Sequence, residues 1–309
     1  MKALVTGAGG FVGAHLTARL VADGWEVAGT VRPGSATDRL GPGVTAVPVD
    51  LGDREATAQL ARSVAPDVVF LLAAGRAAAT RAERAATLAV NASSGAWLVD
   101  GLGEGCTAIV RLGSSTEYAP LDVPMDESAP VRPRSFFGAT KAAGSLLVAA
   151  TAAARGVRAA VLRAFQVYGP GDHPGRLVPT AVRAARTGDE LPLTGPGMRR
   201  DWIFIDDVVE ACVQAALAQH LPAGQVLNIG TGRQVANEEL VAAVERVSGR
   251  EVRVAVGAHS GRSWDTGSWV CDPSRAARLL GWEAKVDLDD GLALCWAEGS
   301  SGLSDQVTR

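Results

Sequence analysis

Ala3-Leu-Val-Thr-Gly7-Ala-Gly-Gly10-Phe-Val-Gly13 is a short apolar strand that meets a glycine-rich turn, and a helical pattern follows at once. Such a turn directs backbone N–H groups and the positive end of a helix at an anion, here the pyrophosphate of a dinucleotide. Gly7 permits the tight turn, Gly10 lets the backbone approach the phosphates, and Gly13 lets the helix pack on the sheet. This setting favours a dinucleotide site over an ordinary strand–helix turn.

The composition is typical of a soluble α/β protein. Of the 309 residues, 47% are hydrophobic and 20% are charged, and this length can bury a large core in one or two joined lobes. The net charge of −3 provides no general field for nucleic acid. No apolar run is long enough to span a membrane and the chain starts directly on a strand, so we expect a cytoplasmic protein without a membrane partner.

The cysteines and histidines carry no metal-binding pattern. Cys106, Cys212, Cys271 and Cys295 are scattered without a CxxC pair, which predicts four reduced thiols in the core. The four histidines form neither an HxxxH nor an HExxH pattern. We therefore expect no metal site.

Strand and helix patterns alternate through the first half of the chain. Strands are expected at 25–31, 44–49, 67–73, 108–112 and 158–165, with helices at 56–64, 85–102 and 139–154. This order predicts an α/β fold, a doubly wound Rossmann parallel sheet whose ligands sit beyond the carboxyl ends of the strands. We expect residues 1–165 to form this dinucleotide-binding domain.

Long turn-rich loops change the pattern after Phe165. Helices are expected at 178–186, 207–218, 237–248 and 273–280, and the glycine- and serine-rich tail from Gly299 is expected to fray. Residues 166–309 are therefore predicted to form mainly a smaller C-terminal α/β substrate lobe. Segments around 201–230 are expected to return to the first domain.

Ser114-Ser-Thr-Glu-Tyr118 follows the fifth strand, at the sheet edge where a nicotinamide would lie. Hydroxyl groups there can hydrogen-bond a substrate oxygen, and a neighbouring carboxylate can orient or exchange a proton. The alternative is a helix cap and turn, which the same residues also form readily.

Phe137-Gly-Ala-Thr-Lys141 places its first and last residues on one helical face. With this segment the chain resembles the extended short-chain dehydrogenase/reductase family, the NAD-dependent nucleotide-sugar epimerases, dehydratases and reductases. The resemblance covers nearly the whole chain and rests on the glycine loop, Asp50-Leu51, Leu72-Ala-Ala74, Asn91, Ser114-Ser115, Lys141, Arg163, Tyr168-Gly-Pro-Gly171, Arg200-Asp-Trp202, Asn228-Ile-Gly-Thr-Gly232 and Leu280-Gly-Trp282.

The resemblance implies a cofactor site and a catalytic group. Its cofactor residues would be Gly7, Gly10, Phe11, Val12, Asp50, Leu51, Leu72, Ala73, Ala74, Asn91 and Lys141. Ser115, Thr116, Glu117 and Lys141 would form the catalytic group, with Ser115 holding the C4 oxygen of a sugar. Lys141 would bond the nicotinamide ribose, and its alternative interpretation is a solvated lysine on a helix.

Phe137 departs from the family pattern, which has a tyrosine general acid/base at this position. A phenyl ring cannot transfer a proton, and such groups contribute about 10²–10⁴-fold in rate. Phe137 is an engineered replacement that holds a substrate complex, or another group such as Glu117, Tyr118 or Ser115 supplies the proton, or the fold is kept for binding alone. The sequence leaves these three readings open.

Gly29-Thr-Val-Arg32 ends the second strand without the acidic residue that usually binds the ribose hydroxyls of NAD. A guanidinium is suited to a 2′-phosphate, so we expect NADP, with NAD as the alternative cofactor. The other interpretation of Arg32 is a surface arginine.

The substrate implied by the resemblance is a nucleoside diphosphate sugar, bound by a homodimeric protein. Arg200 and Arg262 resemble a diphosphate clamp, and ion pairs are their alternative. Leu177, Val178 and Gln166 are expected to line the same site. The adjacent Glu117 and Tyr118 favour a 4-keto-6-deoxyhexose reductase, with a 4-epimerase or 4,6-dehydratase as the alternative and a non-catalytic binder as the alternative from another class.

Overall fold

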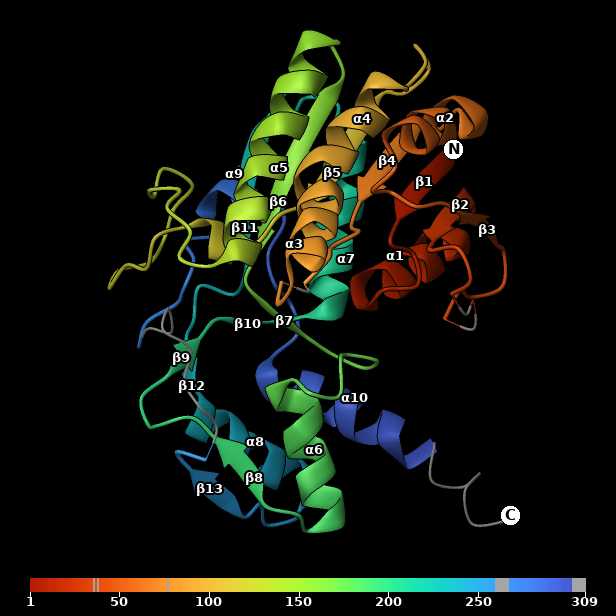
Figure 1. Cartoon of the computed structure of the whole chain (residues 1–309). Coiled ribbons are helices and arrows are strands. Elements are labelled where there is room, and N and C mark those ends of the chain that lie inside the picture. Colours follow the sequence, from red (N-terminus) through yellow and green to blue (C-terminus); the bar gives the residue numbers. More distant parts are fainter. Residues whose placement is uncertain (36, 38, 77, 259–266, 302–309) are drawn as a thin grey trace, which may run out of the picture.

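Seven parallel strands form the main sheet, in the order β11-β6-β5-β4-β1-β2-β3 (Figure 1). The computed structural model describes residues 1–35, 37, 39–76, 78–258 and 267–301. The strands are β1 (Lys2–Thr6), β2 (Glu26–Val31), β3 (Val44–Pro48), β4 (Val68–Leu71), β5 (Ala108–Leu112), β6 (Arg158–Ala164) and β11 (Gln225–Ile229). The predicted doubly wound α/β fold is confirmed, and the strand order reverses between β1 and β4.

Helices cover both faces of this sheet because successive side chains of its strands point to opposite sides. Leu4 of β1 packs in one core cluster with Leu98, whereas Val5 packs in another with Leu16. The helices of the first face are α2 (Arg54–Val64), α4 (Ser94–Asp100) and α5 (Phe136–Ala154), and those of the second are α1 (Phe11–Ala22) and α7 (Ile205–Leu217).

The helix expected at 85–102 differs from the prediction in its start and in its regularity. It begins as α3 (Arg81–Leu88), because Thr80 and Glu83 form a capping box. It then passes through a π-helical turn, η1 (Ala89–Ser93), before it continues as α4. A π turn inserts an extra residue into the helical register, which places Asn91 in the interior.

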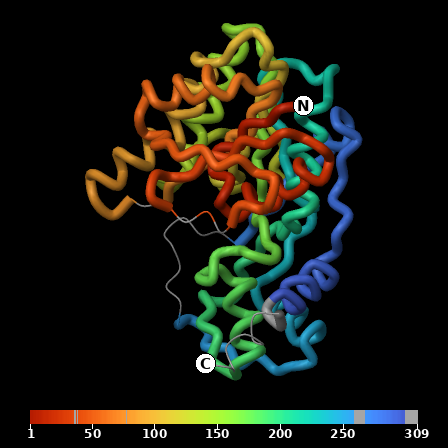
Figure 2. Tube along the Cα trace, turned by 90° about the vertical axis from the view of Figure 1, so that its right-hand side faces the viewer, coloured from red at the N-terminus to blue at the C-terminus, as the bar shows by residue number. Residues whose placement is uncertain are grey.

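The remaining elements form a second lobe beneath the carboxyl edge of the sheet, drawn in green and blue in Figure 2. Its helices are α6 (Leu177–Thr187), α8 (Asn237–Ser248) and α10 (Leu288–Ser301), while α9 (Ser274–Leu280) lies against β11 and α7. Its short strands pair as β7 (Gln166–Tyr168) with β10 (Trp202–Phe204), β9 (Arg199–Arg200) with β12 (Val235–Ala236), and β8 (Leu191–Leu193) with β13 (Val254–Val256).

Helix α10 was not expected from the sequence. Leu292 and Cys295 are buried in the core cluster that includes α8, and Arg246 of α8 pairs with Asp289 at 2.8 Å. These contacts stabilise the helix on the second lobe. Residues 299–301, which were expected to fray, belong to α10, and the rest of the expected tail lies outside the described residues.

The four cysteines are free and buried, as predicted. One helix, α5, is long and apolar enough to cross a membrane, but 44% of its most apolar window is buried inside the fold. That burial is typical of a helix that packs on a sheet.

Candidate functional site

The glycine loop has the geometry of a phosphate cradle. Gly7 has a φ of 71°, and a Cβ on Gly13 would lie 2.1 Å from the carbonyl oxygen of Gly7, so neither position accepts a side chain. Gly10 caps α1 without a side chain, which leaves the N–H groups of the first helical turn for a ligand. The loop lies between β1 and β4, where the strand order reverses, and its residues therefore fit the pyrophosphate of a dinucleotide.

The segment after β4 is fixed against this loop. The hydroxyl oxygen of Thr6 accepts hydrogen bonds from the N–H groups of Leu72 and Ala73, at 3.1 and 3.2 Å. A Cβ on Gly7 would lie 2.8 Å from Cα of Ala73. Leu72 and Ala73, which were predicted as cofactor residues, thus lie beside the glycine loop, where the strand order reverses. Ala74 continues the same segment.

Asn91 holds the next residue of that segment. Its side-chain amide accepts from the N–H of Gly75 at 2.7 Å and donates to the Gly75 carbonyl at 2.9 Å. It also donates to Thr140 of α5 at 2.9 Å. Asn91 therefore ties the segment after β4 to α5, which is the helix that carries Lys141.

Arg32 and Asp50 follow the two strands beyond β1. Arg32 is exposed after β2, and Asp50 follows β3 and accepts from the N–H of Gly52 at 2.8 Å. Leu51 is buried beside it. All three lie at the carboxyl edge of the sheet, on the side of the glycine loop where the adenosine half of a dinucleotide would extend.

Lys141 is buried and donates to the carbonyl of Leu112 at the end of β5. Burial, together with the nearby charge of Arg111, lowers the pKa of Lys141 to about 7. Phe137 lies one turn earlier, and the guanidinium of Arg76 stands 5.0 Å from the centre of its ring. The guanidinium of Arg76 thus lies against the ring at the position where the family pattern has a phenol.

Glu117 is directed into the fold rather than into the site. One carboxylate oxygen accepts from the N–H of Ser114 at 2.9 Å and from the hydroxyl of Ser145 at 3.0 Å. The other accepts from Arg163 at 2.9 Å. These bonds cap the short 3-10 helix η2 (Ser115–Glu117) and hold Ser115 and Thr116 in place.

Ser115 reaches the second lobe. Its hydroxyl oxygen accepts a hydrogen bond from the indole N–H of Trp269 at 2.8 Å. The Tyr118 hydroxyl instead points away and donates to Asn228 at 2.8 Å, and burial raises the Tyr118 pKa to about 12. A Cβ on Gly138 would lie 2.3 Å from the carbonyl of Thr116, so the start of α5 packs directly on η2.

Two residues near this group, Arg111 and Trp269, were not expected from the sequence. Arg111 is buried in β5 and donates to the carbonyl of Asn91 at 2.6 Å, and burial lowers its pKa to about 10. Trp269 was overlooked because it is distant in sequence from Ser115. The signal for Arg111 was a charge within an apolar strand, whereas Trp269 had none.

The predicted substrate residues lie in the second lobe. Arg200 of β9 is half-buried and donates to the carbonyl of Arg199 at 2.7 Å. Gln166 is half-buried in β7, and Leu177 and Val178 begin α6. Arg262 lies outside the described residues.

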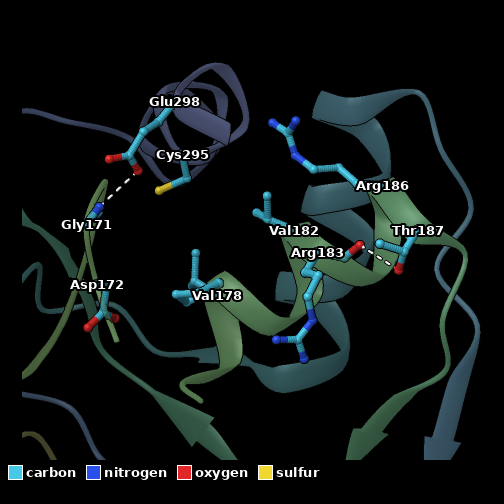
Figure 3. A pocket seen from close by; sticks show the side chains of 11 residues that line it. Gly171, Asp172, Val178, Val182, Arg183, Arg186, Thr187, Cys295 and Glu298 are labelled. Atoms are coloured by element: carbon cyan, nitrogen blue, oxygen red, sulfur yellow. Dashed lines mark hydrogen bonds between the residues drawn. The ribbon is translucent and has the colours of Figure 1, made fainter. Parts of the chain in front are cut away.

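A cavity of about 430 Å³ opens between α6 and α10 (Figure 3). Val178 and Val182 face Cys295 across it, and Glu298 accepts from the N–H of Gly171 at its edge at 2.9 Å. Of the predicted site residues that the structure describes, only Val178 lines this cavity. It is therefore separate from the group around Lys141.

Comparison with known proteins identifies the family of the chain and relatives that match all or part of it. The model of the NAD dependent epimerase/dehydratase family matches residues 3–230. The UDP-glucose 4-epimerase of Mycolicibacterium smegmatis is 30% identical over 311 residues, which cover 95% of this chain and 96% of that protein. The dTDP-glucose 4,6-dehydratase of Streptomyces griseus is 32% identical over 191 residues, or 61% of this chain, and the match spans only 57% of that dehydratase.

Solved structures match over almost the whole chain. The UDP-glucose 4-epimerase of Thermotoga maritima with UDP-glucose has a TM-score of 0.89 at 26% identity and covers 98% of this chain and 100% of its own. MoeE5 in complex with UDP-glucuronic acid and NAD has a TM-score of 0.86 at 30% identity, with the same coverage.

Proposed function

The chain belongs to the NAD dependent epimerase/dehydratase family, and from this premise we propose that it reduces the C4 ketone of a nucleotide-linked 4-keto-6-deoxyhexose. When bound, the nicotinamide cofactor supplies the hydride for this reaction. One observation supports the proposal: Lys141 donates to the carbonyl of Leu112 at the end of β5, and Ser115 lies in η2 just after that strand, so the two candidate residues share this edge of the sheet.

The adjacent Glu117 and Tyr118, rather than Phe137, favour reduction over the related reactions. A 4-epimerase or a 4,6-dehydratase begins by removing a hydride and a proton from the C4 hydroxyl, and a reductase adds both to the C4 ketone. A phenyl ring transfers the proton in neither direction. As the hydride reaches the ketone, negative charge develops on its oxygen; Ser115 would donate a hydrogen bond there, and water would supply the proton.

The cofactor we propose is NADP. Arg32 follows β2, where an acid would favour the ribose hydroxyls of NAD, and its exposed guanidinium is available to a 2′-phosphate. NAD is the alternative, supported by the NAD complex of MoeE5.

The substrate would lie between the lobes. We propose residues 1–165 as the cofactor domain and 166–309 as mainly the substrate lobe, with segments around 201–230 belonging to the first. Arg200 and Arg262 would clamp the diphosphate, with Gln166, Leu177 and Val178 beside it. The sugar would then reach Ser115, Thr116 and Lys141.

We also propose a cytoplasmic homodimer formed through α3 and α5. Leu88 of α3 and Leu146 and Leu147 of α5 are large apolar side chains with 47%, 63% and 43% exposure. Figure 1 shows these helices adjacent on the outer face of the sheet domain. Contact with a second copy of the chain would remove these apolar side chains from water. Leu146→Asp should yield monomers in analytical ultracentrifugation, and an unchanged sedimentation coefficient would argue against this face.

A 4-epimerase is the second candidate, because the relative from Mycolicibacterium smegmatis that matches over nearly the full chain has that name. A non-catalytic nucleotide-sugar binder is the candidate from another class, and the missing phenol at Phe137 favours it.

One experiment separates the three. The protein is incubated with NADPH and a panel of nucleotide 4-ketosugars, and separately with UDP-glucose and NAD. NADPH oxidation with formation of a 4-hydroxy sugar supports the reductase. Conversion of UDP-glucose to its C4 epimer without net cofactor consumption would replace it with the epimerase. Tight binding of both ligands without turnover would leave the binder.

A further inference from the structure

Trp269 connects the second lobe to the catalytic group of the first. Its indole N–H donates to the hydroxyl oxygen of Ser115 at 2.8 Å, across 154 residues of sequence. Ser115 stands in η2 at the carboxyl edge of the sheet, beside the start of α5. Trp269 belongs to the strand-like segment before α9.

The backbone and ring of Trp269 are both held in place. Its carbonyl accepts from the N–H of Asp201 at 2.9 Å, and its own N–H donates to the Gln234 side chain at 3.3 Å. Its ring packs against the buried cluster that contains Tyr118 and Phe165. The indole N–H therefore reaches Ser115 from a fixed position.

In this hydrogen bond only Trp269 can be the donor. An indole N–H is a donor and never an acceptor, whereas a serine hydroxyl has one hydrogen and two lone pairs. Ser115 must accept from Trp269, so its own hydrogen has to point elsewhere. Among the residues that the structure describes, no acceptor is recorded for that hydrogen.

We propose that Trp269 is a positioning residue that keeps the Ser115 hydroxyl as a hydrogen-bond donor toward the C4 oxygen of the substrate. This inference rests on the proposed function. A ketone oxygen can only accept, so a serine with a fixed outward hydrogen matches a 4-ketosugar. Because the indole also orients the hydroxyl before the substrate arrives, the hydroxyl loses less conformational freedom on binding.

The test measures binding, so it does not depend on turnover. Calorimetry gives the affinities of a nucleotide 4-ketosugar and of the matching nucleoside diphosphate for the wild type, Trp269→Phe, Ser115→Ala and the double variant. Trp269→Phe keeps an aromatic ring and loses the N–H. Trp282→Phe is the matched control, because the Trp282 indole also donates a hydrogen bond, to the Asp207 carbonyl at 2.9 Å, within the core.

We expect Trp269→Phe to weaken 4-ketosugar binding about 5- to 10-fold, as one hydrogen bond is worth, and to leave nucleoside diphosphate binding unchanged. In the Ser115→Ala background the same substitution should have no further effect, because the two residues act as one unit. Trp282→Phe should leave both affinities unchanged.

Three results would overturn the inference. They are wild-type affinities in Trp269→Phe, an additive loss in the double variant, or an equal loss for both ligands. The first and second leave the proposed function intact. A wild type that binds neither ligand would overturn both, and a wild type that binds the ketosugar without reducing it would remove only the reductase.

Discussion

The carboxylate of Glu117 lies 2.9 Å from Nε of Arg163, and the two side chains are 0% and 4% exposed. The same carboxylate also accepts from Ser114 and Ser145. A carboxylate with three partners inside the fold is a support for η2, and each of its oxygens is bonded within the fold. Among the alternative proton donors that the sequence suggested, Glu117, like Tyr118, is therefore bonded inside the fold rather than directed at the site.

Removing Glu117 should destabilise the fold. Glu117→Ala leaves the buried guanidinium of Arg163 without its partner, which costs about 3–5 kcal/mol. The free energy of unfolding from urea titration measures this loss. Glu55→Ala is the control, because Glu55 pairs with Arg62 on the surface and such pairs contribute at most about 1 kcal/mol. Equal stabilities of the two variants would contradict the structural role.

Arg32 should decide the choice of cofactor. NADPH should bind more tightly than NADH, and Arg32→Ala should lose that preference while NADH binding stays the same, because only NADPH carries the 2′-phosphate. Fluorescence titration of both cofactors measures the ratio, with Arg62→Ala as a surface-arginine control. Equal affinities in the wild type would show that Arg32 is an ordinary surface arginine.

Arg200 should contribute to binding of the nucleoside diphosphate. Arg200→Ala should cost on the order of 1.5–3 kcal/mol, the range for hydrogen bonds to charged groups. Arg199→Ala is a close control, because Arg199 is the preceding residue and pairs with Glu239 on the surface. Calorimetry with nucleoside diphosphate distinguishes them. If Arg200→Ala binds as well as Arg199→Ala, the clamp is elsewhere.

The sheet could be predicted because its signals are local. The glycine loop fixes β1 and α1 within thirteen residues, and the apolar run at β4 has the length of a strand buried on both faces. The regular alternation of strand and helix patterns then predicts the order of the following elements. Helix α10 was not predicted because its stability comes from packing on α8 and from the ion pair with Arg246. These contacts cannot be inferred from the residues of α10 alone.

The candidate site could be predicted only where a motif marked it. Ser115 was a candidate because of its position after the fifth strand, and Lys141 because of the resemblance to the family. The direction of the Glu117 side chain did not, because it depends on Arg163 and Ser145, which are far apart in sequence. Trp269 illustrates the same limit, since its role exists only once the second lobe is folded against the first.

Lys141 should make stability depend on pH. Burial lowers its pKa to about 7 from an ordinary 10.5. Between these values the unfolded chain holds a proton that the folded protein has released, so stability rises with pH, by at most about 1.4 kcal/mol per unit. Below pH 7 Lys141 is protonated in both states, so the folded protein bears the full free-energy cost of the buried charge. Urea unfolding of the wild type and Lys141→Met from pH 6 to 10 isolates this contribution, because all other groups cancel in the difference. A difference that does not change with pH would mean that Lys141 stays charged in the fold.

Phe137 should separate binding from chemistry. Phe137→Tyr adds one oxygen on the half-buried ring, one helical turn from Lys141, and a phenol there can donate a proton to the C4 oxygen. We expect single-turnover NADPH oxidation with a nucleotide 4-ketosugar to accelerate by about 10²-fold or more, while cofactor and nucleotide-sugar affinities change little. Phe136→Tyr is the matched control, because the neighbouring ring is exposed and points to a different face of α5. A wild type that already turns over as fast as Phe137→Tyr would show that the proton comes from another group. In that case Ser115 is the position to substitute first, since the hydroxyl of Tyr118 is bonded to Asn228 and the carboxylate of Glu117 to Arg163.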